Sequence, residues 1–123
     1  AEAAGYLAQV QSRALGKSVA TLTAQLQTLS KEKFIEACWT ERLREFPLEF
    51  KIWDDCVRTG KFPVISNTMH SGEVTYVNLV GATNGSGATF KQSDLLWPIS
   101  LNEIQRNPKL TQNEGYAKTN KAE

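Results

Sequence analysis

The segment SKEKFIEACWTERLREFPLEFKIWDDCVRTG, residues 30–60, decides the fold class of this chain. Ser30 is a favourable N-cap residue, and Glu32 follows in the first turn, where the helix dipole favours an anion. The apolar residues that then recur every three or four positions are Trp39, Leu43, Phe46, Phe50, Trp53 and Val57. This spacing predicts a helical face rich in aromatic side chains.

Pro47 interrupts that pattern. A proline inside a helix removes one backbone hydrogen bond and clashes with the preceding turn, so we expect a kink or break near Glu45 and Phe46. Gly60 ends the helical pattern. The segment therefore predicts two helical pieces joined at the proline.

Two further helices are expected before this segment. Residues 2–15 are rich in alanine, and Gly16 stops the pattern. The apolar positions at helical spacing there are Ala4, Leu7, Val10, Ala14 and Leu15. Residues 17–29 repeat leucine and valine at similar spacing, although three threonines weaken the helix propensity.

The sequence changes in character after Gly60. Residues 73–80 are rich in valine, threonine and tyrosine and predict a short strand, and residues 84–87, Asn-Gly-Ser-Gly, predict a turn. An irregular region with one or two short strands is favoured over a larger sheet. Residues 101–106 predict a last short helix that Pro108 ends, and 115–123 form a polar tail. The predicted fold is mainly α, with a helical scaffold segment at 1–61 and a loop-rich segment with short β pieces at 62–123.

Composition limits the possible functions. The net charge of +1 over 123 residues gives no basic patch that would select nucleic acid. No apolar run approaches the roughly 20 residues that span a bilayer. Cys38 and Cys56 would lie about 27 Å apart on one continuous helix, too far for a disulfide, although a break between them would relax this. Because His70 is the only histidine, the chain lacks the ligands of a Cys/His zinc site, and we expect no metal and no cofactor.

Candidate catalytic groups have simpler structural explanations. Glu41, Glu45 and Glu49 share one helix side, but nearby arginines would neutralise them as an ion-pair ladder rather than leave a general acid and base. Ser66, Ser71 and His70 are close in sequence, yet no acid is spaced to orient the histidine, so a hydrolase triad is weakly supported.

Aromatic side chains are the remaining candidates for binding, because their faces stack on sugar rings. Trp39 and Trp53 belong to the apolar pattern, and Trp97 lies in an apolar run, so packing is the favoured role of all three. Tyr76 is the most plausible exposed aromatic residue in the 62–97 region, but no residue is assigned to a ligand. The ligand-binding residues stay unknown, and no catalytic residue is assigned.

Three motifs in this order resemble the SusD/RagB-like outer-membrane nutrient-binding lipoproteins. The first is a helix that contains Tyr6-Leu7 and Val10-Gln11-Ser12-Arg13-Ala14. The second comprises Glu41-Arg42-Leu43-Arg44-Glu45-Phe46, Glu49, Trp53, Asp55, Arg58, Gly60 and Lys61. The third comprises Pro98-Ile99, Glu103-Ile104, Asn107-Pro108, Leu110, Gln112-Asn113, Gly115 and Tyr116.

The resemblance implies a fold of tetratricopeptide-like helix pairs with an irregular, loop-rich part. Family members are non-enzymatic, lipid-anchored on the cell surface at the outer membrane, and cover a SusC-like TonB-dependent transporter. They capture oligosaccharides, or peptides in some members, and deliver them for uptake. The chain is then expected to be a C-terminal segment of a longer member, whose ligand is held mostly by the missing part and whose anchor lies at an N-terminus absent here.

The sequence departs from the family pattern at three positions. Gln11 and Ile52 stand where arginine is common, and Cys56 where leucine is usual, so two possible ion pairs are removed. A helical module that binds a partner protein without touching ligand stays open as an alternative function. A helical hydrolase using Glu41, Glu45 or Glu49 would need a carboxylate pair in a cleft free of arginine. We also expect uncovered apolar surface along residues 39–57.

Overall fold

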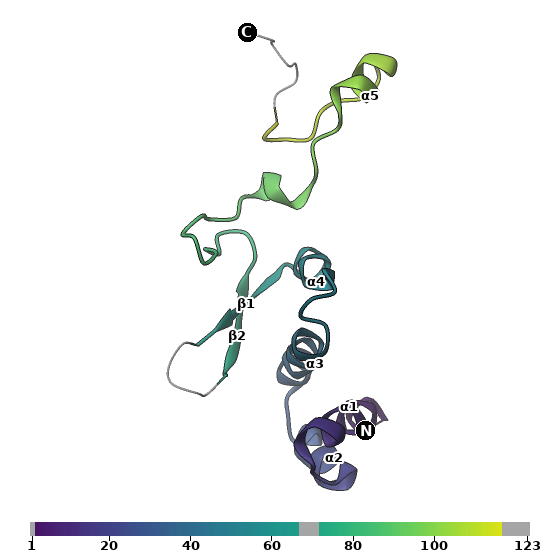
Figure 1. Ribbon diagram of the computed structural model, residues 1–123, viewed down its shortest axis with the longest axis vertical. Helices are drawn as coiled ribbons and strands as arrows, with labels where there is room; N and C mark the ends of the chain where they lie inside the picture. The colour runs from purple at the N-terminus through teal and green to yellow at the C-terminus, as the bar shows by residue number, and fades with distance from the viewer. Residues whose placement is uncertain (1, 67–71, 117–123) are drawn as a thin grey trace. The chain divides into compact units, whose positions relative to one another are not determined.

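A computed structural model describes residues 2–66 and 72–116, and it is mainly helical. The elements along the chain are α1 (Glu2–Leu15), α2 (Val19–Gln27), α3 (Lys31–Glu45), α4 (Lys51–Thr59), β1 (Lys61–Ile65), β2 (Val74–Asn78), a 3₁₀ helix η1 (Gln92–Leu95) and α5 (Leu101–Arg106) (Figure 1). The mainly α fold with short β pieces confirms the predicted fold class. No helix in the described part of the chain is long and apolar enough to cross a membrane.

The chain forms two compact units. Unit 1 comprises Ala1–Asp55 with Val64–Tyr76, and unit 2 comprises Cys56–Pro63 with Val77–Glu123. Unit 1 contains the complete helices α1, α2 and α3, and unit 2 contains η1 and α5.

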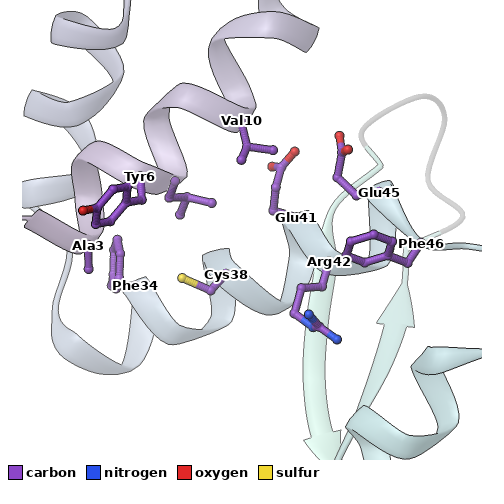
Figure 2. Close-up of a pocket in the computed structure, with 10 residues that line it drawn as sticks. Ala3, Tyr6, Val10, Phe34, Cys38, Glu41, Arg42, Glu45 and Phe46 are labelled. Carbon is purple, nitrogen blue, oxygen red and sulfur yellow. The ribbon is translucent and has the colours of Figure 1, made fainter.

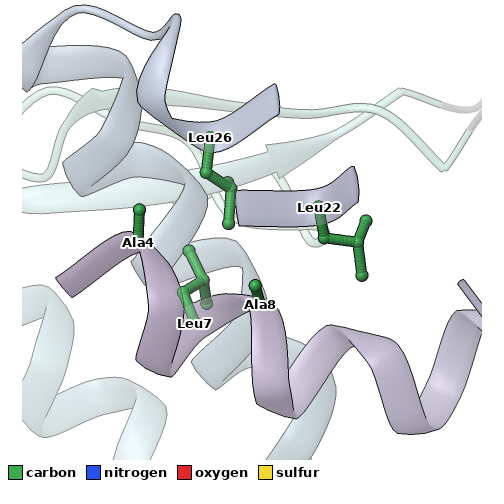
Figure 3. Packing of buried hydrophobic residues seen from close by; sticks show 5 residues of the cluster. All are labelled: Ala4, Leu7, Ala8, Leu22 and Leu26. Carbon is green, nitrogen blue, oxygen red and sulfur yellow. The ribbon is translucent and has the colours of Figure 1, made fainter. Parts of the chain in front are cut away.

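The core of unit 1 lies between α1 and α2. Its buried side chains come from one face of each helix and are Ala4, Leu7, Ala8, Leu22 and Leu26 (Figure 3). Half-buried Phe34, Ala37 and Cys38 of α3 pack against them. Each buried leucine contributes about 1.5–3 kcal/mol of transfer free energy, so this small cluster is the main apolar support of the helix pair.

Local signals fix the ends of these helices as the sequence predicts. Gly16 takes a positive φ of 63°, and its N–H bonds to the Ser12 carbonyl at 3.0 Å, which ends α1. Ser18 caps α2, and Ser30 caps α3 by accepting the Lys33 N–H at 3.3 Å. Both predicted helices before residue 30 are therefore present.

The break at Pro47 is also confirmed, because α3 ends at Glu45 and α4 begins at Lys51. Phe50, one of the residues in the predicted apolar pattern, does not continue a buried face across this break. Phe50 takes a left-handed conformation with φ of 58°, and 93% of its surface is exposed. Helical spacing holds only while the helix continues, so the register is lost across the junction.

The two strands pair as an antiparallel sheet, a pairing that the sequence did not predict. The Ser66 N–H bonds to the Glu73 carbonyl at 3.0 Å, and the Leu79 N–H bonds to the Gly60 carbonyl at 2.8 Å. The predicted turn follows at residues 84–87, where the Asn84 side chain accepts the Ala88 N–H at 2.9 Å.

The end of unit 2 is held by hydrogen bonds to main-chain groups. Gln112 accepts the Ile99 N–H and donates to the Ile99 carbonyl, both at 2.8 Å. Asn113 donates to the Trp97 carbonyl at 2.6 Å, and the Tyr116 hydroxyl donates to the Leu96 carbonyl at 2.9 Å. We call these contacts the terminal bracket. The predicted short helix α5 follows Ser100, its N-cap residue.

Candidate functional site

The three helical glutamates are ion-paired. Glu45 pairs with Arg13 at 2.6 Å and Glu49 with Lys51 at 2.6 Å. Glu41 lies 3.8 Å from Arg44. Two of the arginines near these glutamates differ in their partners: Arg44 contacts Glu41, whereas Arg42 pairs with Asp55 at 2.8 Å.

Glu41 is the most buried of these carboxylates, with 6% of its surface exposed. Gln11, which stands where arginine is common in the family, donates a hydrogen bond to it at 3.0 Å. The departure at residue 11 thus places an uncharged amide donor against Glu41, where an arginine could form an ion pair. The ion pairs of Glu41, Glu45 and Glu49 agree with the ion-pair ladder expected from the sequence. A hydrolase would need two of these carboxylates in a cleft free of arginine, and the structure does not provide such a cleft around them.

The hydrolase triad considered from the sequence used Ser66, His70 and Ser71, and the structure describes one of these three residues. His70 and Ser71 lie outside the described residues. Ser66 directly follows β1, and its N–H bonds to the carbonyl of Glu73, the residue before β2.

The aromatic candidates divide into packed and exposed residues. Tyr76 packs edge-on against Trp39, with ring centroids 5.3 Å apart, and its hydroxyl lies 3.2 Å from the Thr40 hydroxyl. Trp39, Trp53 and Tyr76 are half-buried. The proposal of Tyr76 as an open stacking face gains no support from this packing.

Trp97 is 83% exposed, so the expectation that it is buried was wrong for the described structure. The terminal bracket holds the main chain at residues 96–99 through hydrogen bonds, and these do not require the Trp97 side chain to be covered.

Both cysteines are free thiols in the structure. Cys56 is buried, whereas Cys38 is half-buried, and burial raises the pKa of the Cys38 thiol. A raised thiol pKa lowers the fraction of reactive thiolate. The pKa of Cys38 and the burial of Cys56 therefore give no indication of a nucleophilic cysteine.

A groove of about 450 Å³ lies between α1 and α3 in unit 1 and is open to solvent (Figure 2). We call it the α1/α3 groove. Its lining residues are Ala3, Tyr6, Leu7, Val10, Phe34, Cys38, Glu41, Arg42, Glu45 and Phe46. Ala3, Tyr6 and Phe34 lie toward one end, and Glu45 and Phe46 lie toward the other (Figure 2).

The helical spacing of the apolar residues in α1, Val10 among them, did not predict this groove. In the structure α1 carries two apolar stripes: Ala4 and Ala8 face the core, whereas Tyr6 and Val10 line the groove and are exposed. The spacing of Ala3, Tyr6 and Val10 could have indicated the second stripe.

The described part of the chain is thus mainly helical, with an open groove between α1 and α3 and ion-paired carboxylates beside it. The SusD family profile matches residues 1–116. This chain belongs to the SusD family.

A solved structure of a SusD superfamily protein from Parabacteroides distasonis ATCC 8503 resembles it, with 37% sequence identity and a TM-score of 0.59. That match covers 72% of this chain and 18% of the other, so the matched region spans less than a fifth of the relative's length. No curated protein matches the chain.

Proposed function

We propose that this chain is part of a SusD-type, cell-surface glycan-binding protein that is not an enzyme. The observation that carries the proposal is the family match over residues 1–116, because SusD-family proteins are binding proteins. The paired state of Glu41, Glu45 and Glu49 supports a non-catalytic role for this helix side.

In this proposal the whole protein captures oligosaccharides and hands them to a SusC-like TonB-dependent transporter. It is lipid-anchored at the outer membrane, and the present chain is a C-terminal segment of it. The main ligand contacts are then made by regions outside the chain, which agrees with the half-buried state of Trp39, Trp53 and Tyr76.

Cell fractionation tests this proposal. An antibody against the chain should detect, in the outer-membrane fraction of source cells, a band several times larger than 13.7 kDa. Protease added to intact cells should remove that band if the protein faces outward, while a periplasmic control protein should survive. The large protein should then be retained on immobilised oligosaccharides and eluted by the free sugar.

A soluble band near 13.7 kDa would contradict the proposal. The α1/α3 groove would then favour the second candidate, a helical module that binds a partner protein and no ligand. Trp97, the exposed tryptophan, tests whether this chain itself contacts the sugar. Trp97→Ala should leave sugar retention of the large protein unchanged if the ligand contacts lie elsewhere.

A further inference from the structure

The turn at residues 84–88 contains the one asparagine in the sequence that is followed by glycine. In such a pair the peptide nitrogen of the glycine can attack the side-chain carbonyl carbon, Cγ, of the asparagine, because glycine has no Cβ to hinder the approach. The contacts of Asn84 and Gly85 show how this turn presents the two reacting groups.

Three hydrogen-bond donors converge on the Oδ1 atom of Asn84. The Ser86 N–H lies at 3.0 Å, the Ser86 hydroxyl at 2.8 Å and the Ala88 N–H at 2.9 Å. An amide oxygen has two lone pairs, so three donors exceed what the resting amide accepts well. Attack on Cγ gives this oxygen a further lone pair and a full negative charge. The donor set therefore fits the tetrahedral intermediate better than the resting amide, as an oxyanion hole does.

The same turn brings the nucleophile toward its target. The ring that is closed by the hydrogen bond from the Ser86 N–H to Oδ1 contains both Cγ of Asn84 and the Gly85 nitrogen. The Asn84 N–H bonds to the Ala88 carbonyl at 2.9 Å, and the Gly87 N–H bonds to the Asn84 carbonyl at 3.0 Å, so the main chain around the ring is also fixed. Two reacting groups that are held in one small ring have already lost much of the entropy that a free chain must still lose.

The leaving group and the nucleophile are open to solvent. In the part of the chain that the structure describes, no hydrogen bond holds the Nδ2 atom of Asn84, whereas its Oδ1 atom has three. Asn84 is half-buried, and Gly85 and Ser86 are exposed. Water can therefore take up the proton of the Gly85 nitrogen and carry it to the departing amine.

We propose that Asn84 is a site of intramolecular modification, at which the turn itself promotes the conversion of asparagine to an aspartyl residue. The Gly85 nitrogen forms a bond to Cγ, the bond between Cγ and Nδ2 breaks, and Nδ2 leaves as ammonia with the proton lost by Gly85. Water then opens the resulting succinimide ring at either carbonyl, which gives aspartate or isoaspartate. The reaction requires water and the chain alone.

The two products differ in their effect on the turn. Aspartate keeps an oxygen that can face the same donors and adds a negative charge. Isoaspartate places an additional methylene group in the main chain, which moves the main-chain groups of residue 84 out of register with Ala88 and Gly87. The bridge between Thr83 and Thr89 should then separate. Neither the glycan nor the transporter takes part, so this inference stands or falls independently of the proposed function.

Peptide mass spectrometry of the whole chain tests the proposal. The chain is incubated in isotopically labelled water at neutral pH, once in buffer and once unfolded in urea, and uptake of heavy oxygen at residue 84 measures the conversion. Hydrogen exchange at the Ala88 amide shows in parallel whether the turn is formed. We expect Asn84 to convert about tenfold faster in buffer than in urea. Asn113, whose Nδ2 donates to the Trp97 carbonyl at 2.6 Å, is the internal control and should remain asparagine.

Ser86→Ala removes one of the three donors, and Ser93→Ala is its matched control at a serine outside the turn. S86A should slow the conversion about three- to tenfold in buffer, which is less than the factor of about 10²–10³ for one donor in a buried enzyme site because water reaches this turn. It should leave the rate in urea unchanged, and S93A should change neither rate. Gly85→Ala fits the turn, because no described atom lies within 4 Å of the added Cβ, and its methyl group should slow the attack in buffer and in urea.

Conversion of Asn84 that is no faster in buffer than in urea would overturn the proposal, because the turn would then protect the asparagine. Equal rates for S86A and the parent chain in buffer would also overturn it, since the donors would then not stabilise the intermediate. An Ala88 amide that exchanges as fast in buffer as in urea would show that the turn does not form, and this result too would refute the proposal.

Discussion

Phe50 sits in a conformation that suits glycine, and this makes it the most direct test of the junction between α3 and α4. Its φ of 58° brings Cβ close to the following carbonyl, at a cost of about 1–2 kcal/mol for an L residue. Because the side chain is 93% exposed, its removal forfeits almost no packing. Glycine loses about 0.5–1 kcal/mol more backbone entropy on folding than alanine.

The balance of these two terms predicts that Phe50→Gly is more stable than Phe50→Ala by about 0.5–1 kcal/mol. The assay is urea unfolding followed by far-UV circular dichroism, with both variants measured side by side. Gln9, exposed in the middle of α1, provides the matched control site. There the order should reverse, because glycine is about 0.8–1 kcal/mol worse than alanine inside a helix.

A Phe50→Gly variant that is less stable than Phe50→Ala would contradict this prediction. That result would mean that residue 50 leaves the left-handed region in solution. If both variants at residue 50 are destabilised by more than about 1 kcal/mol relative to the parent, the phenyl ring is packed and not exposed.

Three further perturbations follow from the described contacts. Leu22→Ala removes a buried side chain between α1 and α2 and should lower the free energy of unfolding by about 2–4 kcal/mol. The loss is measured as lost helicity in the same urea titration, and a loss below about 1 kcal/mol would show that α1 and α2 do not form this core. The raised pKa of Cys38 means that the folded state holds its proton more tightly, so stability should fall as pH rises above about 9, and Cys38→Ala should remove this fall in a pH series of melting curves. Gly115→Ala should loosen the terminal bracket, because φ of Gly115 is 88° and the new Cβ would clash with the Ser93 Cβ. Amide hydrogen exchange at Ile99, whose N–H bonds within the bracket, should accelerate at least tenfold, and an unchanged rate would refute the bracket.

Much of the helical part could be predicted from local signals. Ser30 and Gly16 mark the ends of their helices because caps and left-handed glycines satisfy backbone groups within a few residues. Pro47 fixes the break for an equally local reason. The β1–β2 pairing could not be predicted, since it joins residues such as Ser66 and Glu73 through hydrogen bonds that no local pattern encodes.

The candidate site was harder to predict than the helices. Glu41, Glu45 and Glu49 were correctly placed on one helix side, but two of their partners, Arg13 and Lys51, come from outside the expected arginines. Arg13 is 32 residues from Glu45, and only the packing of α1 near α3 decides such a contact.

The sequence by itself determined the family, the order of the helices and the break between α3 and α4. Cap residues, glycines, proline and helical spacing act within one or two helical turns, so their effects can be predicted from the sequence alone. The tertiary structure decided which apolar stripe of α1 is buried, because Leu7 and Ala8 meet α2 while Tyr6 and Val10 are left beside α3. It also left Trp97 exposed in the described chain, where an apolar run had favoured burial. Burial depends on which partner surface approaches a side chain, and that surface is set by long-range packing.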